Sequence, residues 1–553
     1  MPVVTIDGQQ IDVPQGTRII EAAAKLGIYI PRYCYHPGLR IVGSCRMCLV
    51  EVEKAPKLLI ACHTFAQDGM VVHTTTEKVT VARQAILEFL LSNHPLDCPV
   101  CDQAGECKLQ EFYMEFGRYD STMLENKHKK HKAIPVGPHI ILDSERCILC
   151  SRCTRFCDDV TKTHELGIFE RGAHSELLPV KGRTVDNPYS GCLADICPVG
   201  ALTDRDFRFK VRVWYLDSTD SICHGCARGC NIRIDTNRRR THHNDGKLIA
   251  RYKPRFNGEV NGHWMCDAGR YSYKTIEVPE RVLHPSVRIR GGPAERAEWS
   301  MALSQIDEHV SQAVGQHGIA STAVIATPTL SNEELWAVRK LFSEGMRVET
   351  IAFRCPPDPN GVEDDLLRKS DTFPNSFGAE TILGPLSGEK DVSKVLDDAA
   401  AGRYKTVIVI GGGLVERIGA DVLQQKLQSV ELVVAIQTHQ SPVTETASVI
   451  APMATYAETD GTVCNFEGRV QRYWAAIHPV AQSRPLLEIL ADLAQRWELK
   501  TPPRDADLCF EELSGSVGYF DGLTYDDLGE TGRNPKNRQP VGEAAPDTPD
   551  GLL

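Results

Sequence analysis

The residues with the most specific chemistry in this sequence are its cysteines. The chain of 553 residues contains 20 of them, and 17 lie at or before Cys266. Four thiolates can hold an iron–sulfur cluster, and four thiolates can also hold a zinc ion. Because disulfides are disfavoured inside cells, this concentration of cysteines indicates metal ligands. We therefore expect the cysteines to divide into ligand sets of four.

The first set is Cys34, Cys45, Cys48 and Cys62, with the spacing C-x10-C-x2-C-x13-C. Plant-type [2Fe–2S] proteins also hold their cluster on one long loop that contains a C-x2-C pair. A zinc knuckle is the alternative, but most zinc sites have two short C-x2-C pairs, which this asymmetric spacing lacks. We therefore predict a [2Fe–2S] cluster on this loop.

The second set combines one histidine with three cysteines. It is His94, Cys98, Cys101 and Cys107, spaced H-x3-C-x2-C-x5-C. A lone histidine is usually structural, but a cluster of four irons needs a fourth ligand that the nearby cysteines do not supply. A neutral imidazole in place of a thiolate should raise the reduction potential, as it does in Rieske centres. We predict a [4Fe–4S] cluster with His94 as a ligand.

The third set begins with the run C-x2-C-x2-C-x3-C typical of bacterial ferredoxins. In two-cluster ferredoxins the fourth cysteine of each run binds the other cluster. Counting back from Cys197 with the same spacing, the second run has lost its other three cysteines, since those positions hold Asn187, Ser190 and Leu193. We therefore predict one [4Fe–4S] cluster here, without Cys157 or Cys192, on the ligands Cys147, Cys150, Cys153 and Cys197.

The fourth set is Cys223, Cys226, Cys230 and Cys266, spaced C-x2-C-x3-C-x35-C. Four thiolates serve iron and zinc equally well, so a zinc site remains an alternative to a third [4Fe–4S] cluster. Arg238, Arg239 and Arg240 fall within the long gap, where they form either a solvated loop or a contact with a partner.

A substrate site is not evident in the sequence. The only glycine-rich turn after a predicted strand spans residues 411–413, and Glu416 stands where a dinucleotide-binding motif needs its third glycine. We expect no catalytic residue and no NAD or FMN site on this chain. Clusters exchange single electrons, so several of them in one chain indicate an electron relay.

The elements that must position these ligands change character along the chain. An Asp7-Gly8 turn predicts a hairpin near the start, and apolar residues at helical spacing predict helices over 78–92 and 108–116. After residue 275, buried strands such as 406–410 and 432–436 alternate with helical stretches, which predicts α/β structure around a parallel sheet. The proline-rich residues 526–553 predict a disordered tail.

Composition and charge exclude several classes of protein. The 62 basic and 73 acidic residues give a net charge of −11, which argues against nucleic acid as the partner. No apolar stretch approaches the length of about 18 residues that spans a bilayer, and the first residues lack a secretory signal. We expect a cytoplasmic chain.

The four sets in this order resemble the G-subunit family of bacterial NADH–quinone oxidoreductase, respiratory complex I. Residues 43–48 (GSCRMC) and 94–99 (HPLDCP) are similar to that family almost letter for letter, and the resemblance covers residues 1 to about 275. Further on, residues 266–270 (CDAGR) and 458–471 resemble the molybdopterin oxidoreductase superfamily, which supplies the rear domain of proteins in this family.

The resemblance implies a multidomain α+β and α/β protein. It places a β-grasp [2Fe–2S] ferredoxin-type domain at 1–78, a helical [4Fe–4S] domain with one histidine and three cysteine ligands at 79–118, a ferredoxin-type [4Fe–4S] domain at 138–210, a further [4Fe–4S] domain of the kind found before bis-molybdopterin domains at 219–275, and a shortened molybdopterin oxidoreductase-like domain at 276–525. That last region is too short for a full pterin domain, so we expect no molybdenum.

The resemblance also implies a role and partners. Electrons from NADH would enter at a flavin on a neighbouring subunit, cross this chain and leave toward quinone through other iron–sulfur subunits of the peripheral arm. The complex as a whole would translocate protons. Membrane association would come only through partner subunits, on the cytoplasmic side of the inner membrane. The alternatives are a relay subunit of a soluble NAD-linked formate dehydrogenase or hydrogenase, and a zinc-stabilised scaffold without redox function.

Overall fold

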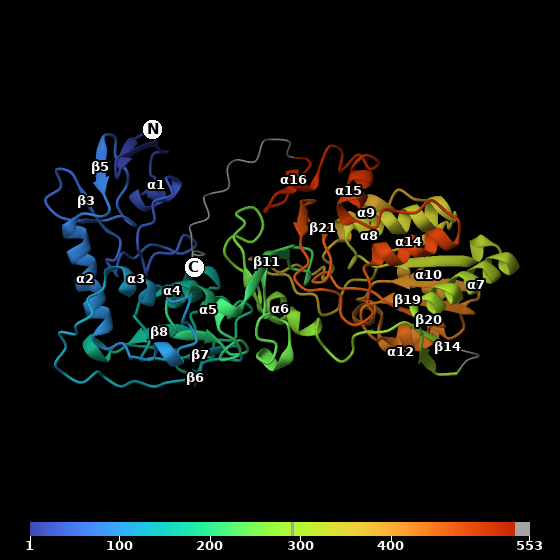
Figure 1. Ribbon diagram of the computed structural model, residues 1–553, viewed down its shortest axis with the longest axis horizontal. Helices are drawn as coiled ribbons and strands as arrows, with labels where there is room; N and C mark the ends of the chain where they lie inside the picture. The colour runs from blue at the N-terminus through green and yellow to red at the C-terminus, as the bar shows by residue number, and fades with distance from the viewer. Residues whose placement is uncertain (289–291, 537–553) are drawn as a thin grey trace. The chain divides into compact units, whose positions relative to one another are not determined.

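The computed structural model describes residues 1–288 and 292–536 as a mixture of α-helices and β-strands (Figure 1). Backbone contacts divide these residues into two units. The first unit holds Met1–Leu216 and Asn237–Gly246, and the second holds Asp217–Thr236 and residues 247–536. The first three ligand sets therefore belong to one unit, and the fourth belongs with the α/β region.

The first unit begins with a mixed sheet that supports the first ligand loop. The predicted hairpin is present, since Asp7 and Gly8 both have positive φ (46° and 84°), as a tight turn of this hand requires. Helix α1 (Ile19–Lys25) buries Ile19, Ile20, Ala22 and Ala23. The sheet has the order β2-β1-β5-β3-β4 and consists of β1 (Val3–Ile6), β2 (Gln9–Asp12), β3 (Leu49–Val52), β4 (Leu59–Ile60) and β5 (Met70–His73).

Two helices follow the sheet, and both lie within one residue of their predicted bounds. The hydroxyl of Thr76 accepts a hydrogen bond from the Val79 N–H (3.4 Å) and caps α2 (Glu77–Leu91). Helix α3 (Lys108–Phe116) starts directly after Cys107, so the last ligand of the second set also marks the start of a helix.

The remainder of the first unit consists of short elements joined by loops. The turn around Ser151 (φ 59°) leads into α4, which continues as the π-helical segment η2. The elements are the sheet β10-β7-β6 (Leu202–Asp204, Ile140–Leu142, Ile134–Pro135), the hairpin of β8 (Leu166–Phe169) and β9 (Glu176–Pro179), α4 (Arg152–Arg155), η2 (Phe156–Val160) and α5 (Cys192–Ile196).

The second unit starts with the antiparallel sheet β11-β12-β13 (Asp217–Ile222, Asn231–Thr236, Ile249–Pro254). Strand β12 begins directly after Cys230, and β13 returns the chain toward α6 (Asp267–Arg270), whose N-cap is Cys266. The long spacing before Cys266 is therefore a β-hairpin followed by a short connection, and not an unstructured insertion.

The rest of the second unit is the α/β structure that the sequence predicted. Its central strands pair in parallel, and β14 pairs antiparallel with β20 at one side. The sheet has the order β15-β14-β20-β19-β18-β16-β17 and consists of β14 (Ser286–Arg288), β15 (Ala294–Arg296), β16 (Thr322–Ala326), β17 (Thr350–Ala352), β18 (Thr406–Ile410), β19 (Leu432–Gln437) and β20 (Val449–Pro452).

Helices cover both faces of this sheet, because alternate residues of each buried strand face opposite sides. In β18, Ile408 and Ile410 join one apolar core while Val407 and Val409 join the other. The first core is covered by α7 (Trp299–His317), α8 (Asn332–Val338), α9 (Ser376–Leu383), α14 (Leu486–Arg496), α15 (Ala506–Ser514) and α16 (Tyr525–Leu528). The second core is covered by α10 (Val392–Ala400), α12 (Ala420–Leu427) and α13 (Pro442–Thr446).

The predicted disordered tail begins too early. Tyr525 and Leu528 are buried in helix α16, and Arg533 pairs with Val470 through backbone hydrogen bonds of 2.8 and 2.9 Å. The apolar residues of α16 outweigh the prolines around them, which is why composition alone misplaced this boundary. Residues 537–553 lie outside the described part of the chain. Within residues 1–288 and 292–536, no helix has the length and apolar character needed to cross a membrane.

Candidate iron–sulfur cluster sites

The four cysteines of the first set form two pairs of adjacent thiols. The backbone N–H of Cys34 donates to the Cys45 sulfur (3.4 Å), and a hydrogen bond between the two side chains lowers the pKa of Cys34 to about 5. In the same way, a hydrogen bond with Cys62 lowers the pKa of Cys48. Two pairs of thiols, each with one sulfur that ionises readily, suit a cluster of two irons with two thiolates on each.

The second set surrounds a buried imidazole. The Nδ1 atom of His94 is buried without a hydrogen-bond partner, and burial, assisted by the charge of Arg146, lowers the pKa of His94 to about 4. The ring is therefore neutral at physiological pH and can offer a nitrogen lone pair to a metal. His94, Cys98 and Cys107 line one cavity of about 390 Å³.

Cys101 does not line this cavity. Its sulfur packs against Gly200, where an added Cβ would overlap it, so glycine is required at that position. The structure thus brings three of the four predicted ligands around one space and places the fourth beside it.

A charged network lies beside the second set, and sequence reasoning missed it. Asp97 accepts hydrogen bonds from Arg146 (3.0 Å) and Lys132 (2.5 Å), and although burial opposes it, these bonds lower the pKa of Asp97. Arg146 is 4% exposed and also pairs with Asp143 (3.3 Å). The pairing of residues so far apart in sequence gives no local pattern from which it could have been predicted.

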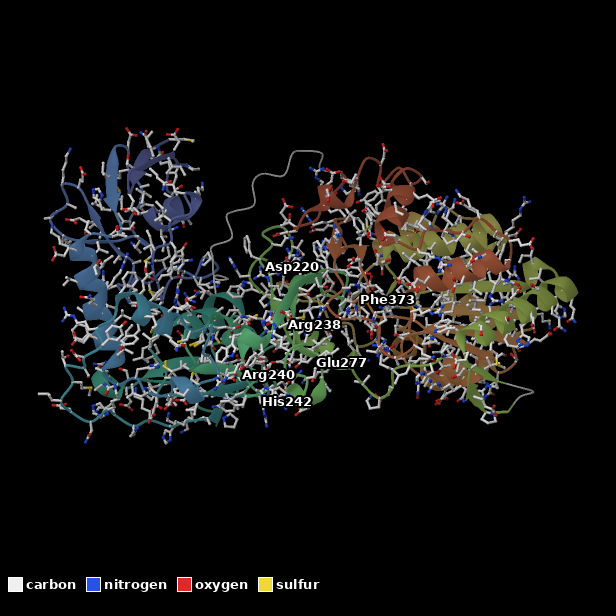
Figure 2. All side chains as sticks on the ribbon, viewed as in Figure 1. Asp220, Arg238, Arg240, His242, Glu277 and Phe373 are labelled. Atoms are coloured by element: carbon white, nitrogen blue, oxygen red, sulfur yellow. The ribbon has the colours of Figure 1, made fainter. Side chains whose placement is uncertain are left out.

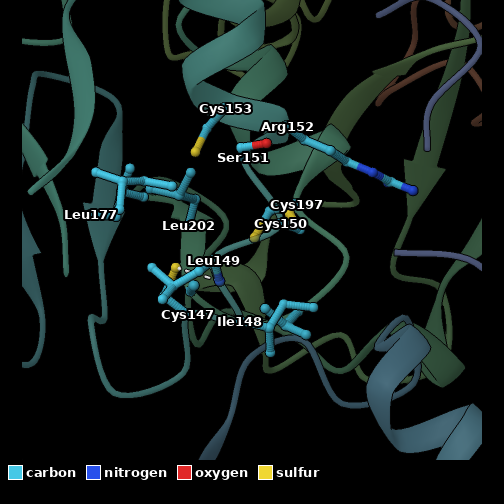
Figure 3. Close-up of a pocket in the computed structure, with 13 residues that line it drawn as sticks. Cys147, Ile148, Leu149, Cys150, Ser151, Arg152, Cys153, Leu177, Cys197 and Leu202 are labelled. Carbon is cyan, nitrogen blue, oxygen red and sulfur yellow. Dashed lines mark hydrogen bonds between the residues drawn. The ribbon is translucent and has the colours of Figure 1, made fainter. Parts of the chain in front are cut away.

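The third set lines one small apolar pocket, as Figure 3 shows. Burial raises the pKa of Cys147 to about 12 and that of Cys150 to about 11, so these thiols need a bound cation or cluster to ionise. The backbone N–H of Leu149 donates to the Cys147 sulfur (3.4 Å). All four predicted ligands border the pocket: Cys147, Cys150, Cys153 and Cys197.

The two cysteines left out of this set lie outside that pocket and are fully buried. Cys157 lies in η2, where burial and then the negative charge of Glu165 raise its pKa to about 12. Glu165 accepts hydrogen bonds from the backbone (3.2 Å) and side-chain amide (2.5 Å) of Asn187. Asn187 holds one of the three positions from which a second cluster would need a cysteine. Cys192 starts helix α5.

One apolar cluster connects the first three ligand sets. Its fully buried members include Tyr33, Met47, Leu109, Phe112 and Val199. Cysteines of all three sets pack against it: Cys45, Cys107, Cys147, Cys150 and Cys197. Ligands of all three predicted clusters in the first unit therefore border one shared apolar core.

The fourth set lines a cavity of about 130 Å³ in the second unit. The backbone N–H of Gly269 donates to the Cys266 sulfur (3.4 Å), and a Cβ on Gly269 would lie 2.8 Å from the Cys223 sulfur, so the loop requires glycine there. Among the described residues, no three histidine, cysteine, aspartate or glutamate side chains are arranged to hold a single metal ion. The cavity is several times larger than the roughly 30 Å³ that one water occupies.

Two further segments noted in the sequence, the basic one that contains Arg240 and the glycine-rich turn at 411–413, contact other residues of the chain. Arg240, labelled in Figure 2, lies over the ring of Tyr215 (4.7 Å), and Lys210 pairs with Asp245 (2.6 Å). At the turn after β18, Gly411 and Gly413 have positive φ (87° and 82°), and Phe373 packs beside Gly413.

Four family models match the chain, and the first three of them along the sequence cover the first three ligand sets. They are the 2Fe-2S iron-sulfur cluster binding domain (residues 3–77), the NADH-ubiquinone oxidoreductase-G iron-sulfur binding region (83–122), the NADH-quinone oxidoreductase subunit 3 ferredoxin-like domain (137–203) and molybdopterin oxidoreductase (385–496). The chain therefore carries 2Fe-2S and 4Fe-4S binding domains and a molybdopterin oxidoreductase domain.

Curated relatives agree with this. The G subunit of NADH-quinone oxidoreductase from Rickettsia bellii is 30% identical over 90% of this chain and 87% of its own length, and that of Rickettsia typhi is 30% identical over 88% and 86%. The mitochondrial 78 kDa subunit of NADH-ubiquinone oxidoreductase from Candida albicans is 40% identical, over 63% of this chain and 47% of its own.

Among solved structures, a chain of an NAD+-reducing [NiFe]-hydrogenase aligns with 38% of this chain and 91% of its own, at 32% identity and a TM-score of 0.35. The relatives that match nearly the whole chain are subunits of one oxidoreductase complex. This chain belongs to the G-subunit family of NADH-quinone oxidoreductase.

Proposed function

We propose that this chain binds one [2Fe–2S] and three [4Fe–4S] clusters and that the first three relay single electrons within an NADH-quinone oxidoreductase. The ligands are Cys34, Cys45, Cys48 and Cys62 for the first; His94, Cys98, Cys101 and Cys107 for the second; Cys147, Cys150, Cys153 and Cys197 for the third; and Cys223, Cys226, Cys230 and Cys266 for the fourth. When bound, each cluster takes up and gives up one electron.

The observation that carries this proposal is the shared apolar cluster of the first unit. Side chains such as Leu109 and Phe112 are buried in this cluster, and cysteines of all three sets pack against it. Burial and hydrogen bonding to the ligands are the means by which a protein sets cluster potentials. Three sites that border one apolar core suit a path for electrons better than they suit separate structural metal sites.

For the fourth site, we propose a cluster in place of zinc, and the space beside its cysteines is compatible with that choice. A zinc ion lies about 2.3 Å from each of its four thiolates, which leaves no space among them. The four sulfurs of this set instead border a cavity of about 130 Å³. We propose that this fourth cluster has a structural role in the second unit, to which all four of its ligands belong, and that the relay uses the first three clusters.

The names of the relatives, which are subunits of a multi-subunit complex, support a proposal about the partners. We propose that a flavin- and NADH-binding subunit supplies the electrons and that other iron–sulfur subunits of the peripheral arm receive them on the way to quinone. The chain would attach to the cytoplasmic side of the inner membrane through these partners. The molybdopterin oxidoreductase-like region would act as a scaffold without molybdenum. A relay in a soluble formate dehydrogenase or hydrogenase is the less supported alternative.

Metal analysis with electron paramagnetic resonance (EPR) of the full chain, purified without oxygen, tests the proposal. We expect about 14 iron atoms per chain with equivalent sulfide, and signals of both cluster types after reduction. Molybdenum should be absent. A chain that holds about four zinc ions instead would contradict the relay and support a structural scaffold. Co-purification with a flavoprotein and membrane subunits tests the partners separately.

A further inference from the structure

We propose that Arg155, assisted by Arg152, is a buried cation that joins the ligand loops of the [2Fe–2S] cluster and the third cluster and raises the reduction potential of both. The inference rests on the proposed ligand sets. Both arginines fill variable positions between the cysteines of the third run, so cysteine spacing alone does not reveal their role.

Arg155 lies at the end of α4 and is 2% exposed. One end of its guanidinium donates to the carbonyl of Cys34 (2.5 Å), a ligand of the first set, and to the carbonyl of Arg40 on the same loop. It also donates to the carbonyls of Cys150 (3.3 Å) and Ser151 (3.1 Å) in the third set's loop. A single side chain thus links the backbone of a ligand from each set.

Arg152 forms a second link between the same two regions. It donates to the carbonyl of Tyr35 (2.6 Å), next to Cys34, and to the carbonyl of Ile196 (3.0 Å), next to Cys197. Its side chain extends away from the sulfurs of the third set in Figure 3. The guanidinium group suits this role because its donors are fixed in a planar fork that can reach several carbonyls at once.

The charge of Arg155 has no carboxylate partner within residues 1–288 and 292–536. Its acceptors are neutral carbonyls and the Ser151 hydroxyl. The nearby Asp158 and Asp159 pair instead with Arg40, at 3.7 and 3.4 Å. A buried charge without a partner is strongly unfavourable, so the fold must supply negative charge close by.

The clusters can supply that charge. A cluster held by four thiolates would carry net negative charge, and Arg155 contacts a ligand residue of each of the two sets that would hold one, Cys34 and Cys150. Reduction would add one electron and therefore one further negative charge, which a buried cation attracts more strongly than the same cation would in water. Arg155 should therefore favour the reduced form of both clusters, and its removal should lower both potentials.

The test is an EPR-monitored redox titration of the full chain, with dithionite as the reductant. In Arg155→Gln, we expect the ratio of reduced to oxidised form at a fixed potential to fall about tenfold for both clusters, which is about 59 mV for a one-electron couple. In Arg155→Lys, which keeps the charge but loses the fork, the ratio should stay within about threefold of the wild type. The clusters of His94 and of Cys266 serve as internal references and should not shift.

Arg281→Gln is a matched control. Arg281 is also 2% exposed and also holds backbone carbonyls, but it pairs with Glu458 (2.9 Å) in the second unit. Its removal should lower stability without moving either potential. If Arg155→Gln does not retain its clusters, Arg152→Gln replaces it, with an expected fall of about threefold in the same direction.

Three outcomes would overturn the inference: unchanged potentials in Arg155→Gln, equal shifts in Arg155→Lys and Arg155→Gln, or unchanged potentials in Arg152→Gln where that variant is the one measured. A wild-type chain without the expected cluster signals would instead refute the proposed ligand sets, so the two failures are distinguishable.

Discussion

The ferredoxin-like region contains two stretches that correspond to the two cysteine runs of a two-cluster ferredoxin. The two stretches differ in the residues that hold the ligand positions. One stretch presents Cys147, Cys150 and Cys153 to an apolar pocket, which Cys197 completes. In the other stretch, Asn187 replaces a ligand and hydrogen-bonds to the buried Glu165. The first is the proposed cluster site, and the second is a hydrogen-bonded, buried region.

The difference shows what replaces a lost cluster. A cluster provides both volume and ligand contacts, so its loss leaves buried polar groups that need new partners. Glu165 and Asn187 satisfy one another, and the thiol of Cys157 stays protonated beside them because burial and the Glu165 charge raise its pKa. The fold therefore persists without the second cluster because hydrogen bonds hold the region together.

The largest expected effect comes from the proposed cluster site of the third ligand set. Cys197→Ser should remove one [4Fe–4S] signal and about four iron atoms per chain, because a hydroxyl is a poor cluster ligand. Iron analysis and EPR of the reduced chain measure both. A variant that keeps its full iron content would mean that Cys197 is not the fourth ligand, and the comparison would fail.

In the stretch without a predicted cluster, the Glu165–Asn187 pair should contribute measurably to the stability of the protein. Glu165→Ala leaves the Asn187 amide buried without its acceptor, which should cost about 2 kcal/mol of unfolding free energy. Thermal unfolding of the cluster-loaded chain measures the change, with the isosteric Glu165→Gln as a milder control. A double-mutant cycle with Asn187→Ala isolates the pair. Simple additivity of the two single variants would show that the pair is not coupled.

Cys157→Ser should have a smaller effect and should keep every cluster signal. The buried hydroxyl should cost about 1 kcal/mol, whereas the iron content should match the wild type. This variant is the matched counterpart of Cys197→Ser, because the same substitution is made at the cysteine that the older ferredoxin pattern would have used. Loss of iron here would reverse the ligand assignment.

The smallest expected effect concerns reactivity. Because the pKa of Cys157 is raised to about 12, its thiolate form is rare at pH 8, and the thiol is buried. Iodoacetamide should leave Cys157 unmodified in the loaded chain at that pH, as detected by peptide mass spectrometry. Urea-unfolded chain, in which the same residue should react, is the control. Rapid alkylation in the native state would show that this part of the region opens readily.

Local sequence patterns predicted many elements well. The Asp7-Gly8 hairpin, the helices α2 and α3, and the alternation of buried strands and helices in the second unit follow from turn chemistry and periodicity. The tail boundary was wrong because the apolar packing of α16 is a tertiary effect. The position of Cys101 away from the cavity beside His94 was likewise beyond the reach of spacing alone.

The sequence by itself determined the cysteine sets and the family, because ligands for a cluster must recur at short, characteristic separations along the chain. Tertiary structure decided which polar groups surround those sets. The links from Arg155 to Cys34 and from Glu165 to Asn187 join residues 121 and 22 positions apart. Such contacts depend on how loops pack together, and a linear pattern contains no record of that packing.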